Sequence, residues 1–131
     1  MDKVTFFFDR NFGVRLPKAI RYLSPPFQVE WHQAHFRQES PDDEWMAELT
    51  GLGWTVLSHD RKFHSEATEN LAVKQHKLGC FYLPCERDPK WDKAAIFFKT
   101  YKKMMEIVRT EQHPFIYNIS ASGRITKVDL G

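Results

Sequence analysis

Cysteines and long apolar runs are scarce in this sequence, and each absence excludes a class of protein. The two cysteines, Cys80 and Cys85, are separated by four residues and have no second pair, so they form neither a disulfide framework nor a zinc signature. No apolar run approaches the roughly 20 residues of a transmembrane helix, and Asp9 ends the first run too early for a signal peptide. We therefore expect a cytoplasmic protein with reduced thiols and no membrane anchor.

An excess of charge of one sign is also lacking. The chain carries 19 Lys and Arg residues against 17 Asp and Glu residues, a formal net charge of +2. Such a small charge creates no strong field, so an anionic partner must be bound by a local patch. With 131 residues, 42% of them hydrophobic and 27% charged, the chain has a globular composition and the length of one domain over residues 1–131.

Short apolar runs alternate with amphipathic segments along the chain. The predicted strands are apolar runs bounded by charged or turn residues, at residues 3–8, 27–31, 54–58 and 79–83. The predicted helices have apolar residues at helical spacing, over residues 16–23, 41–50, 66–77 and 91–110. Two last strands, at 115–119 and 124–128, flank the Ser122–Gly123 turn and predict a hairpin.

The pattern of these elements predicts the fold class. Strands alternate with helices, and the strands are apolar throughout rather than at every second residue, which favours a mostly parallel sheet covered by helices on both faces. The expected fold is α/β: a three-layer α/β/α sandwich with a mostly parallel central sheet, a long C-terminal helix and two short strands.

The helix predicted after residue 40 begins with a cluster of acids. Ser40 is the expected N-cap and Pro41 the expected first helical residue. Asp42, Asp43 and Glu44 then fill the first turn, where the helix dipole favours negative charge.

Three acidic segments should meet at one edge of this sheet. Asp9 follows the first predicted strand, Asp60 follows the third, and the helix opened by residues 42–44 leads into the third. Open α/β sheets bind ligands outside the carboxyl ends of their strands. Converging carboxylates repel one another unless a cation neutralises them, and such oxygen ligands suit Mg²⁺ or Mn²⁺. The alternative is that each acid only caps or complements a neighbouring helix.

At these residues the chain resembles the PIN-like domain family, most closely the short PIN-like proteins related to VapC-type toxins of toxin–antitoxin pairs. Residues 6–11 (FFFDRN) match an apolar strand that ends in Asp, with Asn two residues on. Residues 41–46 (PDDEWM) match an acidic cluster at a helix start, and residues 56–60 (VLSHD) match an apolar strand followed by Ser-x-Asp. The motifs span roughly residues 3–84, and the remainder is similar to one toxin-like subgroup.

This resemblance implies a metal-dependent endoribonuclease, the toxin component of a toxin–antitoxin pair, that hydrolyses RNA phosphodiesters with carboxylate-bound Mg²⁺ or Mn²⁺. Carried over residue by residue, Asp9 is the first metal ligand and Asp60 the third-position acid. Asp42 is preferred as the second ligand because it holds the matching distance from Gly53. Asp43 is the next choice and Glu44 the third.

Four further residues are candidates for contacts at the substrate, two from the resemblance and two from their charge. Asn11 matches a polar residue at the edge of the site, and Ser58 matches a hydroxyl that orients an acid or a water. Arg10 and Arg61 directly follow the two key acids and are candidates for contacts to RNA phosphates. Ordinary solvated surface charge is the alternative for both arginines.

The resemblance also implies a partner besides the RNA substrate, a cognate antitoxin protein. A second copy of the chain, forming a homodimer, is a further candidate. The apolar side of the helix over 91–110, with Phe97, Met104 and Met105, is expected in the core, and any exposed part of it would suit such a partner.

One departure from the family pattern supports a second hypothesis. Relatives often carry another acid two residues after the third-position Asp, where this chain has Lys62; Glu66 or Glu69 could replace it. A depleted acid set suggests a non-catalytic PIN-like module that binds RNA or protein. A receiver-like signalling domain is disfavoured, because Arg10 stands where adjacent acids are needed after the first strand.

His32 and His35 form a third pattern, in the loop after the second predicted strand. A metal pair needs a third ligand nearby, and nothing in the sequence marks one. We expect solvated or hydrogen-bonded loop histidines, with His35 as an alternative substrate contact.

Overall fold

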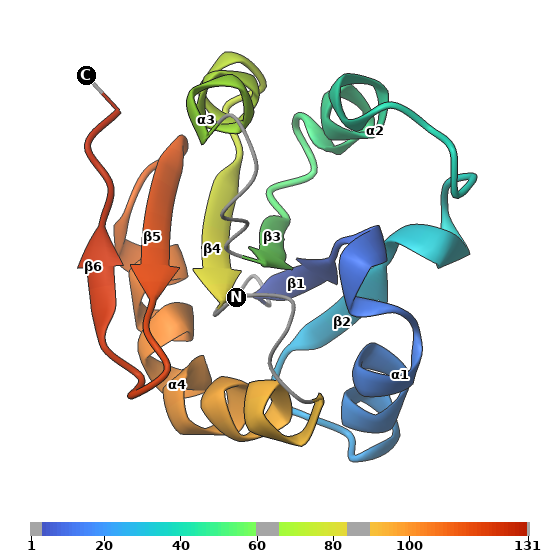
Figure 1. The fold of residues 1–131 in the computed structure, drawn as a ribbon, viewed down its shortest axis with the longest axis vertical. Helices are drawn as coiled ribbons and strands as arrows, with labels where there is room; N and C mark the ends of the chain where they lie inside the picture. The colour runs from blue at the N-terminus through green and yellow to red at the C-terminus, as the bar shows by residue number, and fades with distance from the viewer. Residues whose placement is uncertain (1–3, 60–65, 84–89, 131) are drawn as a thin grey trace.

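A six-stranded sheet forms the centre of the computed structural model, which describes residues 4–59, 66–83 and 90–130 (Figure 1). The strands are β1 (Thr5–Phe8), β2 (Gln28–Trp31), β3 (Thr55–His59), β4 (Gly79–Leu83), β5 (Phe115–Ile119) and β6 (Ile125–Lys127). The helices are α1 (Arg15–Tyr22), α2 (Asp42–Leu49), α3 (Glu66–Gln75) and α4 (Lys90–Thr110), with short 3-10 turns η1 (Arg10–Phe12) and η2 (His32–Ala34).

The strands are arranged in the order β2-β1-β3-β4-β5-β6. The pairings among β1 to β5 are all parallel, and β6 runs antiparallel to β5. Helices α1 and α4 cover one face of the sheet, while α2 and α3 cover the other (Figure 1). The predicted three-layer α/β/α fold, with its long C-terminal helix and final hairpin, is confirmed. The element ends lie within about two residues of the predicted ones, which is ordinary for helix and strand boundaries.

The consecutive phenylalanines of β1 show why the strands are apolar throughout. Side chains alternate between the two faces of a sheet, so Phe6 and Phe8 belong to the core under α1 and α4, whereas Phe7 belongs to the core under α2 and α3. All three rings are fully buried. A strand between two helical layers must therefore be apolar at every position.

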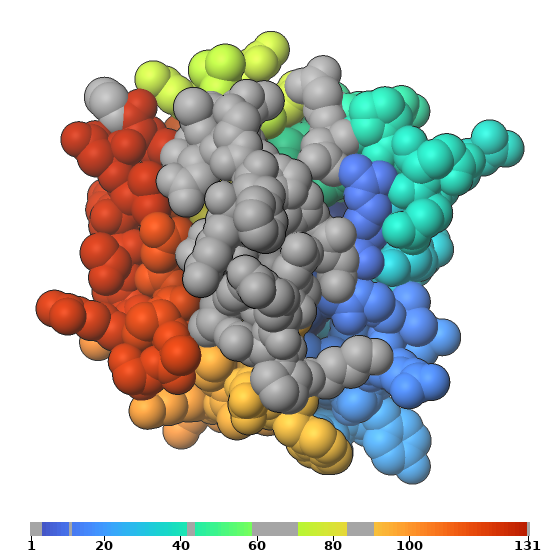
Figure 2. All heavy atoms as spheres, viewed as in Figure 1, coloured from blue at the N-terminus to red at the C-terminus, as the bar shows by residue number. Residues whose placement is uncertain are grey.

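Helix α4 supplies much of the first core. Phe97 lies 5.9 Å from Phe6 and 5.6 Å from Phe8, measured between ring centroids. Met104 and Met105 are also buried, so this side of α4 is core as expected. Side chains of α4 and α1 adjoin along one margin of the molecule (Figure 2).

The start of α2 differs from the prediction by one residue. Pro41, rather than Ser40, is the N-cap, and α2 begins at Asp42. The backbone of Pro41 is extended, with φ −60° and ψ 146°, and its carbonyl accepts hydrogen bonds from the amides of Glu44 (3.1 Å) and Trp45 (3.3 Å). The φ that proline imposes suits the N-cap as well as the first helical position. The preference of proline for helix starts therefore does not distinguish between these two positions.

Within residues 4–59, 66–83 and 90–130, no helix is both long and apolar enough to span a bilayer.

Candidate functional site

The carboxyl ends of β1, β2 and β3 lie side by side. Phe8, the last residue of β1, pairs in parallel with Trp31 of β2 and with Leu57 of β3. The residues that follow these pairs, Asp9, His32 and Ser58, therefore share one edge of the sheet. This is the edge at which open α/β sheets bind ligands.

Asp9 is fixed at this edge by its backbone and by its side chain. The Asp9 amide donates to the Leu57 carbonyl at 3.0 Å, which extends the pairing of β1 with β3 by one residue. The Ser58 hydroxyl donates to Oδ2 of Asp9. Asp9 is only 4% exposed and Ser58 only 6%. A buried carboxylate is costly without hydrogen bonds or a cation, so the Ser58 hydroxyl both stabilises and orients this one.

The chemistry at Asp9 fits a hard cation. A carboxylate has about four acceptor sites, so the hydrogen bond from Ser58 is compatible with a metal on the same group. Oxygen ligands of this kind suit Mg²⁺ and Mn²⁺ rather than softer metals. No cluster of three or more candidate ligand side chains occurs within the part of the chain that the structure describes.

Helix α2 brings its first turn to the same edge. Trp45, which is 2% exposed, lies 5.5 Å from Phe7 near the end of β1 and 5.7 Å from His32 after β2, between ring centroids. Asp42 and Asp43 are the first two residues of α2, and their side chains lie outside what the structure describes. The anchoring of Trp45 thus holds the backbone of the acidic turn near the ends of β1 and β2.

The remaining predicted site residues divide into two groups. Asp60 and Arg61 lie outside the described residues, as does the side chain of Asn11, which belongs to η1. Glu44 is described, and its side chain is exposed on α2. Of the predicted residues, the structure brings together Asp9 and Ser58 in direct contact.

Arg10 has a set of contacts that its sequence position did not suggest. Its Nη1 donates to two backbone carbonyls in the segment before α2, that of Gln38 at 2.6 Å and that of Ser40 at 2.7 Å. The Arg10 carbonyl accepts a hydrogen bond from the Gln33 side-chain amide at 3.1 Å. Arg10 therefore ties the end of β1 to the segment that leads into the acidic helix.

The two loop histidines have different environments. Nε2 of His35 donates to Oε1 of Glu30 at 2.8 Å, as a hydrogen-bonded surface histidine. His32 is completely buried, with its ring packed against Phe36 and Trp45. Of the two expected environments, solvated or hydrogen-bonded, the first does not hold for His32, because Trp45 of α2 packs against its ring at the end of β2.

A buried lysine near the start of α4 was missed by the sequence interpretation. Lys93 is 6% exposed and lies in the turn of α4 that follows β4. The signal was present in the helical spacing, since Lys93 precedes the buried Phe97 by four residues and so shares its inward side. Its side chain therefore lies beneath the helix surface rather than in solvent.

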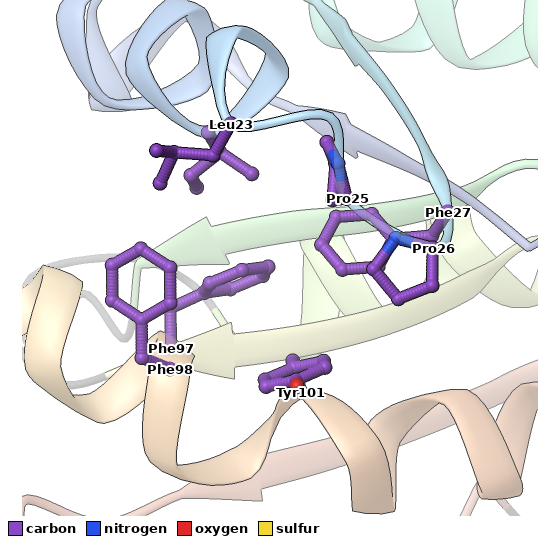
Figure 3. A pocket seen from close by; sticks show the side chains of 8 residues that line it. Leu23, Pro25, Pro26, Phe27, Phe97, Phe98 and Tyr101 are labelled. Atoms are coloured by element: carbon purple, nitrogen blue, oxygen red, sulfur yellow. The ribbon is translucent and has the colours of Figure 1, made fainter.

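A separate hollow lies between α1 and α4. It has a volume of about 170 Å³ and is lined by apolar and aromatic residues, among them Leu23, Pro26 and Phe98 (Figure 3). These residues come from the segment before β2 and from the middle of α4, away from the ends of β1 and β3. The lining holds no charged side chain, so this hollow does not suit a metal ion or a phosphate.

Comparisons with known proteins agree with one part of the sequence interpretation. The chain matches the family model described as PIN-like domain over residues 4–85, the stretch from β1 to just beyond β4. Neither the search of curated proteins nor the search of solved structures gave a match.

Proposed function

Since the chain belongs to the PIN-like domain family, we propose that it is a metal-dependent endoribonuclease. PIN-like domains are commonly nucleases that use divalent metal ions. The observation that carries the proposal is the buried Asp9 carboxylate, held by the Ser58 hydroxyl at the ligand-binding edge of the sheet.

The proposed metal ligands are Asp9, Asp42 and Asp60, with Asp43 and then Glu44 as alternatives to Asp42. This donor set consists of carboxylate oxygens, which matches the preference of Mg²⁺ and Mn²⁺. When bound, the metal supplies an activated water and stabilises the charge that develops during phosphodiester hydrolysis.

The other residues of the site would orient the acids and bind RNA. Ser58 holds the Asp9 carboxylate in one orientation, as partners of metal ligands commonly do. Asn11 and Arg61 are the proposed RNA contacts, the first by hydrogen bonding and the second by its charge on a phosphate.

The test is RNA cleavage by the purified chain. Structured and single-stranded RNA is incubated with Mn²⁺, Mg²⁺ or EDTA, beside Asp9→Asn and Asp60→Asn chains purified in the same way. The proposal expects cleavage that requires metal and is lost in both variants. Cleavage retained in both variants would mean a contaminating nuclease or a different site.

A matched series resolves the second ligand. Asp42→Asn, Asp43→Asn and Glu44→Gln each remove one negative charge from the same helical turn. Glu48→Gln, an exposed charge change near the other end of α2, is expected to retain activity and serves as the control. Loss of cleavage in one of the three variants of the acidic turn identifies the ligand.

The narrower biological role is also a proposal. We propose that the chain acts as the toxin of a toxin–antitoxin pair, neutralised by an antitoxin, with a homodimer as a further form. The test is expression in a bacterial cell: wild-type chain should arrest growth and Asp9→Asn should not. Equal growth of the two strains would contradict the toxin role while leaving the nuclease untouched.

The competing function is a non-catalytic binding module, which Lys62 favours because relatives often carry an acid there. Such a module would bind RNA or protein in EDTA as well as in Mn²⁺, and would cleave nothing. Metal-dependent cleavage excludes it.

A further inference from the structure

Arg10 joins two segments that carry the proposed metal ligands. It follows Asp9 directly in sequence, and its guanidinium reaches 28 and 30 residues along the chain to the carbonyls of Gln38 and Ser40. Both hydrogen bonds are short, as expected when a charged donor meets a carbonyl. One side chain therefore connects the end of β1 to the entrance of α2.

The segment held by Arg10 ends where the acidic turn begins. Ser40 is two residues before Asp42, and the intervening Pro41 has a fixed φ and caps the helix. The Ser40 amide closes a local turn onto the Arg37 carbonyl at 3.1 Å. Fixing the Ser40 carbonyl thus limits where the first turn of α2 can lie.

The acidic turn has a second anchor on its other side. Trp45 packs against Phe7 and His32, beneath the helix. With Arg10 before the turn and Trp45 after it, the backbone of Asp42 and Asp43 is held from both ends. Trp45 is an ordinary core contact, whereas Arg10 ties the turn to the residue next to Asp9.

We propose that Arg10 is a positioning residue, which sets the acidic turn of α2 against Asp9 so that the two segments can share one metal ion. This inference rests on the proposed function. It gives Arg10 a different role from the phosphate contact that its sequence position suggested.

The direction in which metal affinity changes when Arg10 is replaced distinguishes a positioning role from a purely electrostatic one. A guanidinium beside a divalent cation repels it, so loss of the charge alone would tighten metal binding. Loss of a positioning contact weakens it instead, by about 10- to 100-fold for groups that orient metal ligands. A phosphate contact would leave metal binding in the absence of RNA unchanged.

The experiment is a calorimetric Mn²⁺ titration of the full chain without RNA. Arg10→Met is compared with wild type and with Arg21→Met, which removes an arginine that also donates to a backbone carbonyl, that of Val29. We expect about 10-fold weaker Mn²⁺ binding in Arg10→Met, little change in Arg21→Met, and partial recovery in Arg10→Lys, whose ammonium can still donate.

Hydrogen exchange on the same metal-free samples provides a second readout. The amides of Ser40 and of residues 42–46 should exchange faster in Arg10→Met than in wild type, while those of α4 should not. This readout reports the loss of the contact even if Arg10→Met remains fully folded, and uniform acceleration would reveal a general loss of stability.

The outcomes distinguish the two proposals. If wild type binds Mn²⁺ and Arg10→Met binds equally or more tightly, the positioning role is overturned and the proposed function stands. If wild type binds no Mn²⁺, the proposed function is overturned, and the role of Arg10 in a metal site with it. Weaker binding together with local acceleration of exchange supports the positioning role.

Discussion

The Ser58 hydroxyl donates a hydrogen bond to Oδ2 of Asp9, and this contact joins the ends of β1 and β3 across 49 residues of sequence. Both side chains are buried. The contact makes the orientation of the Asp9 carboxylate a property of the sheet rather than of a loop. In the proposed metal site, Asp9 would therefore be ordered before the metal arrives.

Removal of the Ser58 hydroxyl should weaken both the fold and metal binding. Ser58→Ala leaves a buried carboxylate without this donor, which should lower the free energy of unfolding by about 1–3 kcal/mol. Urea denaturation measures this effect, and Mn²⁺ titration should show weaker binding. Thr55→Val is the control at the other end of β3. The Thr55 hydroxyl is buried and has no hydrogen-bond partner among the described residues, so its loss should cost little.

Asp9→Asn should separate stability from function. The substitution keeps the shape of the side chain and removes a charge that is 4% exposed, so the desolvation cost of that charge disappears. We expect the metal-free variant to melt no lower than wild type in a thermal unfolding experiment. Mn²⁺ at 100 times its Kd should stabilise wild type by about 2.7 kcal/mol and the variant far less. A variant that melts well below wild type without metal would show that Asp9 is mainly structural.

The raised pKa of the buried Tyr117 predicts that the folded protein loses stability at alkaline pH. Burial, and then its hydrogen bond to Glu111, raise the pKa of Tyr117 to about 12 from an ordinary value of 10.0. Because the folded chain holds this proton more tightly than the unfolded chain, the contribution is complete below pH 10 and is lost as the pH rises toward 12.

The variant Tyr117→Phe tests this assignment. It should cost about 1 kcal/mol near neutral pH through the lost hydrogen bond, and the difference from wild type should shrink as the pH rises from 10 toward 12. Urea denaturation at several alkaline pH values measures the difference. A difference that stays constant across this range would exclude Tyr117 as its source.

Gly79 should tolerate no side chain. A Cβ added there would lie 2.5 Å from Cζ and 2.7 Å from Cε2 of Phe115, whose ring is fully buried on the neighbouring strand. We expect Gly79→Ala to lower the free energy of unfolding by about 1–3 kcal/mol. In the double variant with Phe115→Leu, the two effects should be less than additive, because the smaller side chain relieves the clash. Strict additivity would argue against a direct contact.

The fold could be predicted because its signals are local and redundant. Runs such as Phe6–Phe8, apolar on both faces, indicate a strand between two helical layers, and alternation with helices then fixes the sheet as mostly parallel. The convergence of segments at the carboxyl edge follows from that topology. The position of Asp9 was therefore predictable from the strand alone.

The details of the site were harder to predict from the sequence, for physical reasons. Consecutive helix residues point about 100° apart, so choosing between Asp42 and Asp43 requires knowledge of the exact residue at which the helix begins. The sequence pattern predicted that residue one position too early. The reach of Arg10 to Gln38 and Ser40 leaves no trace in local spacing, since a long side chain can contact any segment within its radius. The burial of His32 depends on distant packing, since Trp45 of α2 and Phe36 cover its ring.

The most direct test of the proposed metal site is calorimetric titration of Mn²⁺ into the metal-free wild-type chain and into Asp9→Asn. Glu106→Gln, an exposed charge change on α4, serves as the control. A metal site built on Asp9 predicts saturable binding to wild type and to Glu106→Gln, and binding that is lost or strongly weakened in Asp9→Asn. Equal binding in all three chains, or no binding to wild type, would contradict it.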